Sequence, residues 1–310
     1  MILQTIIGGN GTIGKEVAKQ LHSMNIQVRI ASRTPKKVNA TDQVIEMDVF
    51  NEQSVSEAIK GSSVVYLILG LPYKDQVWLD GFPRAVRSVI DSCQKEGAKL
   101  IYFDNVYMYG RVDGWMTEGL SNKPDSVKGT ARMIAADLIL EAIKRQELQA
   151  MICRSADFYG DYPYFDVIKQ IAVALQKNKK AMLLFRDDKK HSITYIPDAA
   201  KAVAFLAQQS DAYQQIWHLP TDPNALTGKQ LVELVAEIIK KEPRYKVISK
   251  GLIKFISLFN GQLKELMKLS YQWENDYLFS SEKIEKKYNI KALSYKEGIT
   301  DHLKSIGILK

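Results

Sequence analysis

Short apolar runs alternate with helical patterns through the first half of the chain. Continuous runs with β-branched residues are typical of strands buried on both faces, and apolar positions three or four apart indicate helices. The expected strands are residues 3–7, 26–30, 44–47, 64–69, 100–103 and 150–153, and the expected helices are 54–60, 77–95 (with Pro83 as a kink or a new start) and 128–145. This alternation predicts an α/β fold with a Rossmann-type, doubly wound parallel sheet.

The alternation loosens after residue 154. The expected elements there are a helix at 165–176, a strand at 182–185, a segment 192–198 that enters a helix to about 208, a strand at 215–219 and a helix capped by Thr227. With no repeat or low-complexity linker, we expect a smaller C-terminal substrate domain interleaved with the first. Residues 1–155, completed by about 192–218, form the predicted dinucleotide-binding domain, and about 156–191 with 219–310 form the substrate or lid domain.

The glycine-rich turn after the first strand carries the clearest chemistry. Gly8, Gly11 and Gly14 lie between the apolar run 3–7 and a helical pattern that begins at Ile13. In this context the first glycine allows a tight turn, the second lets a pyrophosphate approach the backbone, and the third lets the helix pack close to the strand. The helix N-terminus then faces the phosphates. The candidate cofactor contacts here are Gly8, Asn10, Gly11, Thr12, Ile13 and Gly14.

The end of the second strand bears on the choice of cofactor. An acidic residue about 20 positions past the glycines normally holds the ribose 2′-hydroxyl. Arg33 occupies that place, with Ser32 beside it and Lys36 and Lys37 just after it. A guanidinium suits a 2′-phosphate, so NADP is favoured and NAD is the alternative.

Further candidate cofactor contacts follow the third and fourth predicted strands. Asp48 and Val49 can line the adenine, although Asp48 is equally a strand-terminal turn residue. Leu69 and Gly70 end the apolar run 64–69.

Composition excludes several classes of function. The chain has 310 residues, 46% of them hydrophobic and 25% charged, with a net charge of +8 spread along the sequence rather than gathered in one stretch. We expect no nucleic-acid partner, no membrane span, and, without an export signal, a cytoplasmic location. Cys93 and Cys153 lie in apolar patterns and are expected to be reduced, and the scattered histidines predict no metal site.

Residues 251–269 combine apolar residues with lysines and are broken at Asn260 and Gly261. A basic amphipathic segment of this kind can lie on a membrane surface. A lid or wall of the substrate domain is the favoured interpretation.

Taken together, the motifs resemble the extended short-chain dehydrogenase/reductase family, in its sugar-nucleotide epimerase/dehydratase branch. The resemblance covers nearly the whole chain. Its marks are the Gly8/Gly11/Gly14 turn, Asp48, Tyr109–Gly110, Arg154, Phe158–Tyr159–Gly160 and Ile193–Asp198. It implies a dinucleotide cofactor and a small-molecule substrate, nucleotide-linked ones included, and leaves monomer and homodimer both open.

The chain departs from the family where proton transfer is expected. The family carries a serine after the fifth strand and Tyr-x-x-x-Lys on the next helix, and these places fall to Asn105, Lys128 and Arg132. Arg132 can donate hydrogen bonds to a ribose but cannot act as an acid or base. Lys128 can act as a proton donor in a closed cleft, Asn105 as a neutral donor, and Tyr107 as an alternative acid. We therefore expect an NADP-dependent oxidoreductase or an epimerase/dehydratase relative with altered proton-transfer residues. The alternative is a non-catalytic NADP(H)-binding sensor or regulator.

Overall fold

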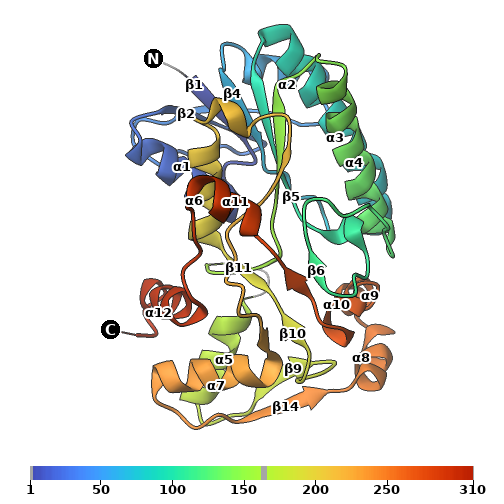
Figure 1. The fold of residues 1–310 in the computed structure, drawn as a ribbon, viewed down its shortest axis with the longest axis vertical. Helices are drawn as coiled ribbons and strands as arrows, with labels where there is room; N and C mark the ends of the chain where they lie inside the picture. The colour runs from blue at the N-terminus through green and yellow to red at the C-terminus, as the bar shows by residue number, and fades with distance from the viewer. Residues whose placement is uncertain (1–2, 162–165, 310) are drawn as a thin grey trace. The chain divides into compact units, whose positions relative to one another are not determined.

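A seven-stranded parallel sheet forms the centre of the first of two units in the computed structural model, which describes residues 3–161 and 166–309 (Figure 1). The strand order is β12-β7-β5-β4-β1-β2-β3, and every neighbouring pair is parallel. This is the order of a doubly wound Rossmann sheet, so the predicted fold class is confirmed. The strands are β1 Leu3–Ile7, β2 Gln27–Ser32, β3 Gln43–Glu46, β4 Val64–Leu67, β5 Lys99–Asp104, β7 Ala150–Arg154 and β12 Ile216–His218.

Contacts within the chain divide it into two compact units. The first unit comprises Met1–Gly110, Ser121–Ser155 and Ala199–Leu219, and the second comprises Arg111–Leu120, Ala156–Asp198 and Pro220–Lys310. Residues 111–120 and 192–198 therefore lie in the second unit, whereas the sequence assigned them to the first.

Helices pack on the sheet of the first unit around an apolar core. All four residues of β4 are buried, and α3 and α4 lie side by side in the core with β4, β5 and β7 (Figure 1). The helix α3 continues through Pro83 as a single element. The helices are α1 Thr12–Ser23, α2 Glu52–Ile59, α3 Asp75–Glu96, α4 Val127–Lys144 and α6 Ile196–Leu206, which crosses into this unit, with short 3-10 turns η1 Tyr107–Tyr109 and η2 Ser210–Ala212.

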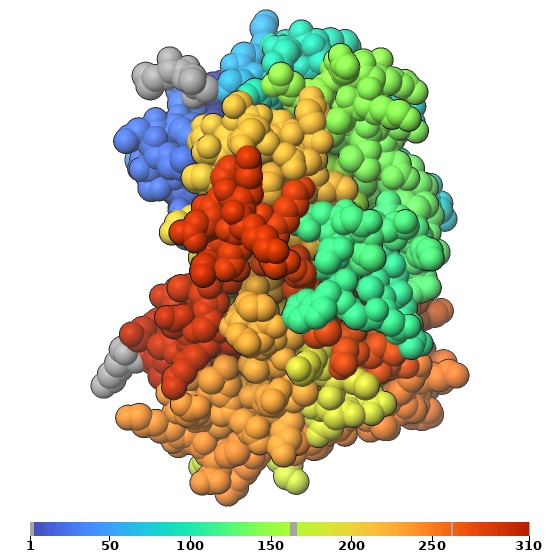
Figure 2. All heavy atoms as spheres, viewed as in Figure 1, coloured from blue at the N-terminus to red at the C-terminus, as the bar shows by residue number. Residues whose placement is uncertain are grey.

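The second unit combines small sheets with helices. The chain from residue 220 onward belongs to this unit, and much of it is visible in orange to red in the space-filling view (Figure 2). Its strands pair in twos: β6 Trp115–Met116 with β15 Leu278–Phe279, β8 Asp157–Tyr159 with β11 Ile193–Tyr195, β9 Ala181–Leu184 with β14 Tyr245–Ile248, and β10 Lys190–His191 with β13 Leu226–Thr227. Its helices are α5 Val167–Gln176, α7 Gly228–Ile239, α8 Lys250–Ser257, α9 Gly261–Met267, α10 Tyr271–Glu274, α11 Glu282–Tyr288 and α12 Tyr295–Ser305.

Local sequence signals explain several element boundaries in this unit. Thr227 caps α7 in a capping box with Gln230, as its position before the helical pattern predicts. The break expected at Asn260 and Gly261 separates α8 from α9. The helix expected at 165–176 is α5, which is described from Val167; its expected first residue, Phe165, lies outside the described residues.

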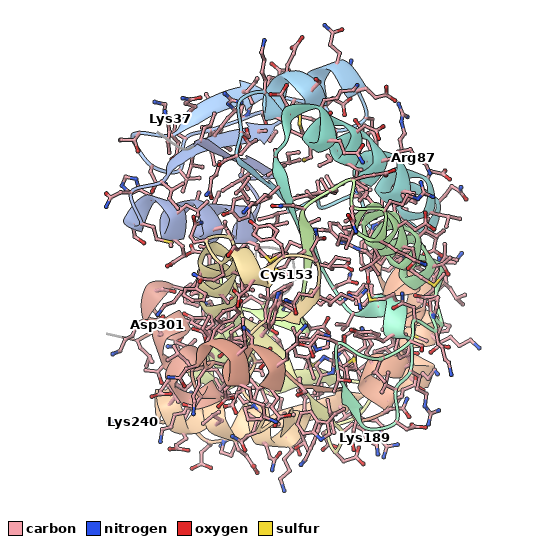
Figure 3. The ribbon with its side chains drawn as sticks, turned by 45° about the horizontal axis from the view of Figure 1, so that its top comes forward. Lys37, Arg87, Cys153, Lys189, Lys240 and Asp301 are labelled. Carbon is pink, nitrogen blue, oxygen red and sulfur yellow. The ribbon has the colours of Figure 1, made fainter. Side chains whose placement is uncertain are left out.

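Both cysteines are free and buried in the first unit. Cys153 lies in β7, among the interior side chains (Figure 3), and Cys93 lies in α3. Burial raises the pKa of the Cys93 thiol to about 12 and raises the pKa of the Cys153 thiol further. Both residues are therefore thiols at neutral pH.

Candidate functional site

The glycine turn joins β1 to α1 by the tight path that the spacing predicts. Gly8 has φ +82°, a conformation that side chains rarely adopt, and a Cβ there would collide with the carbonyl oxygen of Ile68. A Cβ on Gly14 would lie 2.6 Å from the carbonyl oxygen of Gly8, so the missing side chain lets α1 pack against the turn. Gly11 is the N-cap of α1 and donates its N–H to the oxygen of Gly8 at 2.9 Å.

The start of α1 has the chemistry that a pyrophosphate requires. Thr12 and Ile13 are the first residues of the helix, where backbone N–H groups lack partners within the helix and the helix dipole is positive. With no side chain on Gly11, an anion can approach these groups closely. The residues from Gly8 to Gly14 thus form a tight turn that leads into a helix N-terminus able to bind an anion.

Asn10 ties the glycine turn to the segment that follows β2. Its Oδ1 accepts hydrogen bonds from the hydroxyl of Ser32 at 2.9 Å and from the N–H of Lys36 at 3.0 Å, and its Nδ2 donates to the carbonyl oxygen of Lys36 at 2.8 Å. The segment between these two residues carries Arg33, whose side chain is exposed. Asn10 thus holds the Arg33 segment beside the turn, a positioning role that the sequence alone did not indicate.

The remaining candidate cofactor residues follow β3 and β4. The Oδ1 of Asp48 accepts the N–H of Phe50 at 3.0 Å, which is the turn role weighed for it, and its side chain is exposed. Val49 is buried in the core, Leu69 is half-buried and packs against that core, and Gly70 is exposed.

Asn105 and Tyr107 both take part in the turn after β5. The Oδ1 of Asn105 accepts the N–H of Tyr107 at 3.0 Å, which ties the start of the η1 turn. The ring of Tyr107 stacks on Trp78 of α3, with ring centroids 6.1 Å apart. Gly129 lets α4 pack against this turn, because a Cβ there would lie 2.5 Å from the carbonyl oxygen of Tyr107.

Lys128 is fully buried at the start of α4, where the cap is Ser126. Its Nζ lies 2.6 Å from the Oδ1 of Asp75, the first residue of α3, and 4.5 Å from the centre of the Tyr73 ring. The first turn of α4 thus holds a buried cation paired with a carboxylate, not a solvated lysine.

Arg132, one turn further along α4, is also buried and paired. Its Nη1 donates to the hydroxyl of Tyr102 at 2.8 Å and to the Oδ1 of Asp104 at 3.3 Å, and its guanidinium carbon lies 3.8 Å from the ring centre of Phe82. Burial alone would lower the pKa of Arg132, but Tyr102 and Asp104 raise it above its ordinary value. Arg132 is a fixed positive charge.

Asp104 joins Arg132 to a second buried arginine, a connection that the sequence analysis missed. The Nε of Arg154 lies 3.6 Å from the Oδ2 of Asp104, and its Nη1 donates to the hydroxyl of Tyr109 at 2.8 Å. That hydroxyl lies 2.8 Å from the Nε2 of His218. Burial raises the pKa of Asp104, and the two arginines oppose the rise.

A signal for this network is present in the sequence. Asp104 and Arg154 each end an apolar run, and the carboxyl ends of adjacent parallel strands meet at one edge of a sheet. In the register of β5 and β7, Asp104 pairs with Arg154. Opposite charges at those two ends therefore indicate a buried ion pair.

Within residues 3–161 and 166–309, no helix has both the length and the hydropathy of a membrane span. Over the same residues, no group of three or more His, Cys, Asp or Glu is arranged to hold a metal ion.

Comparisons with known proteins agree with the geometry of the turn and sheet. A family model described as the NAD dependent epimerase/dehydratase family matches residues 4–219. A search of curated protein sequences finds no significant match.

Solved structures of sugar-nucleotide enzymes have the same fold. MoeE5 in complex with UDP-glucuronic acid and NAD is 18% identical, with 99% of each chain covered and a TM-score of 0.80. The UDP-N-acetylglucosamine 4-epimerase of Bacillus cereus is 14% identical, with 100% of this chain and 98% of the other covered and a TM-score of 0.78. The dTDP-glucose 4,6-dehydratase of Bacillus anthracis, in complex with NAD, is 14% identical, with 98% and 96% covered and a TM-score of 0.81.

Proposed function

The chain belongs to the NAD dependent epimerase/dehydratase family, and we propose that it is an NADP-dependent member whose proton-transfer residues differ from the family pattern. The observation that carries the proposal is the turn from Gly8 to Gly14, where missing side chains and a helix N-terminus fit a pyrophosphate. The first unit is the proposed cofactor-binding domain, and the second is the proposed substrate domain.

The segment after β2 supports NADP over NAD. Asn10 holds this segment beside the turn, and Arg33, Lys36 and Lys37 present three exposed cations there. A guanidinium can pair with both oxygens of a 2′-phosphate, whereas the acidic residue that would bind a 2′-hydroxyl is absent from this position. The solved neighbours named above contain NAD, so cofactor choice is a property to be tested on this chain.

Titration with NADPH and NADH tests the cofactor proposal. We expect tighter binding of NADPH, and we expect Arg33→Ala to weaken it by about ten- to a hundredfold, the range of a hydrogen-bonded charge pair, while NADH binding is unchanged. Arg87→Ala, at an exposed position of α3, is the matched control and should change neither affinity. Equal affinities for the two cofactors in the wild type would refute the assignment.

The residues at the family's proton-relay positions favour reduction of a carbonyl. A bound nicotinamide exchanges a hydride with a substrate carbon, and the substrate oxygen must then gain or lose a proton. The ammonium of Lys128 and the guanidinium of Arg132 are hydrogen-bond donors and not acceptors. Lys128 can stabilise the negative charge that develops on a carbonyl oxygen, but it is a poor base for removing an alcohol proton.

The second candidate function, a non-catalytic NADP(H) sensor or regulator, is favoured by the pairing of these same cations. Lys128 is paired with Asp75, and Arg132 with Asp104 and Tyr102. The Asn105 oxygen is bonded to the Tyr107 backbone. Because Lys128, Arg132 and Asn105 are bonded to other residues of the chain, they can stabilise the fold without taking part in a reaction.

A comparison of turnover and cofactor affinity distinguishes the two candidates. NADPH oxidation is measured with a panel of small carbonyl compounds and nucleotide-linked 4-keto sugars. If Lys128 assists the reaction, Lys128→Met should lower kcat/KM by about 10²- to 10⁴-fold while the Kd for NADPH stays within about twofold. Lys144→Met, at the far end of the same helix, is the control and should retain wild-type turnover. Tight NADPH binding without turnover of any panel member supports the sensor, and turnover unaffected by Lys128→Met removes Lys128 from the mechanism.

A further inference from the structure

The most exposed large apolar side chains in the described residues lie on α8 and the loop to α9. Five large side chains are exposed within eight residues, and Phe259 and Leu258 are 83% and 72% exposed, more than any other large apolar side chain described. We call this group the α8 patch: Leu252, Phe255, Ile256, Leu258 and Phe259. Large contiguous apolar patches are rare on soluble proteins, and those that do occur are often binding sites.

The patch occupies a defined side of the helix. Leu252, Phe255, Ile256 and Phe259 follow the three- and four-residue spacing of one helical face, and the rings of Phe255 and Phe259 meet edge to face with centroids 6.0 Å apart. A different face of α8, carrying Ile253 and Ser257, is buried. The helix therefore uses one face to pack on its own unit and presents a second apolar face outward.

Several contacts hold the patch in place. Ser249 caps α8, Lys250 lies 2.7 Å from Glu274 of α10, and α8 packs against α9. Leu269, just after α9, is fully buried. The exposed rings are thus carried on an anchored pair of helices, orange in Figure 1.

The charges around the patch are mostly positive. Residues 250–268 contain one acidic side chain, Glu265, and four exposed lysines: Lys250, Lys254, Lys264 and Lys268. Lys268 lies 2.7 Å from Glu265 and Lys250 lies 2.7 Å from Glu274, so Lys254 and Lys264 carry the excess of positive charge. An exposed apolar helical face with lysines on the polar side of the same short segment is typical of helices that lie in the interface of a membrane with anionic lipids.

We propose that α8 and α9 dock on the surface of an anionic lipid bilayer, with the α8 patch inserted among the lipids and the lysines at the headgroups. A two-fold contact between two copies would instead bring the same lysines of both chains toward each other, and like charges oppose such a contact.

Vesicle flotation tests this docking with the full-length protein. We expect the wild type to float with vesicles of equal parts phosphatidylglycerol and phosphatidylcholine and to remain at the bottom with phosphatidylcholine alone. Raising NaCl to about 0.5 M should weaken flotation, because salt screens exposed charges. The double variant Phe255→Ser/Phe259→Ser should bind about a hundredfold less, since it removes two large exposed rings. Lys254→Glu/Lys264→Glu should bind less by a similar factor.

Matched controls separate the patch from surface composition in general. Met24→Ser and Lys60→Glu change an exposed apolar residue and an exposed lysine of the first unit, and both variants should float like the wild type. Circular dichroism melts establish that each variant is folded. Failure of the wild type to float, or equal flotation of the phenylalanine variant, overturns the proposal. A wild-type dimer that Phe255→Ser/Phe259→Ser converts to a monomer, measured by light scattering, also overturns it, because a second copy then covers the patch.

Discussion

Replacing Asp104 with asparagine is expected to destabilise the first unit strongly. The change keeps the size of the side chain and an oxygen that can accept the N–H of Asn105, as the Oδ1 of Asp104 does at 2.9 Å in the wild type. It removes the negative charge between Arg132 and Arg154, which are 7% and 1% exposed. Two buried guanidinium groups would then share a site without a carboxylate.

The structure sets the expected size of the effect. The carboxylate oxygens of Asp104 lie 3.3 Å from Arg132 and 3.6 Å from Arg154. At an effective dielectric constant of about 20, each attraction amounts to roughly 5 kcal/mol. The desolvation cost of the carboxylate, which the variant avoids, offsets part of this, and loss of one partner of a buried ion pair typically costs about 3–5 kcal/mol. We expect a decrease in the free energy of unfolding in that range.

Urea unfolding followed by circular dichroism measures the decrease. Asp188→Asn is the matched control, because Asp188 also accepts an arginine, at 2.6 Å, but both members of that pair are about half-exposed. Solvent screens such a pair, so the control should unfold at the wild-type urea concentration. A decrease of less than about 1 kcal/mol for Asp104→Asn would refute the view that these arginines depend on this carboxylate.

Three further predictions follow from the glycine turn, its clamp and the buried thiols. Gly14→Ala should lower the free energy of unfolding by about 1–3 kcal/mol and should also weaken NADPH binding, because the new Cβ would lie 2.6 Å from the carbonyl oxygen of Gly8. An unchanged thermal unfolding curve and an unchanged NADPH titration would contradict this prediction. Asn10→Ala should weaken NADPH binding more than NADH binding in titrations, and an equal loss would show that the clamp orders only the turn. Cys93 should resist a thiol reagent at pH 8 until the protein unfolds. Rapid labelling of the folded protein would contradict the burial of this thiol. Folding raises the pKa of Cys93 from 9.0 to about 12, so the stability that the buried thiol contributes is fully present below pH 9 and is lost as the pH rises toward 12.

The sheet and its cofactor turn were predictable because their signals are local. The run from Val64 to Leu67 is apolar at every position, and β4 buries every one of those residues. The glycine spacing between a strand and a helix likewise depends on neighbours in the sequence. In contrast, β6 and β15 have two residues each, at Trp115–Met116 and Leu278–Phe279, and pair across more than 150 positions. Two residues show no periodicity, so such strands cannot be recognised before the chain is folded.

The polar network lay between these extremes. Asp104 and Arg154 could be paired once the strand ends were placed, because neighbouring parallel strands end at one edge. The partner of Lys128 could not be found in that way, since Asp75 begins α3 and meets α4 only through helix packing. The sequence therefore pointed to the cations Lys128 and Arg132 but not to the carboxylates that hold them.

The carboxylates of Asp75 and Asp104 bear on the roles that Lys128 and Arg132 can have. A buried lysine or arginine without a partner is costly, so Lys128 and Arg132 would destabilise the fold if no carboxylate lay beside them. Asp75 and Asp104 lie within 2.6 Å and 3.3 Å of these cations, and each carboxylate compensates one of them. Each of the two cations therefore has a carboxylate beside it, and Asp104 shares its charge between Arg132 and Arg154. The two pairs differ in their access to solvent: Asp75, the partner of Lys128, keeps 22% of its side chain exposed, whereas the side chain of Asp104, the partner of Arg132, is fully buried. The Lys128–Asp75 pair is accordingly where we expect any proton or hydrogen bond to reach a substrate oxygen.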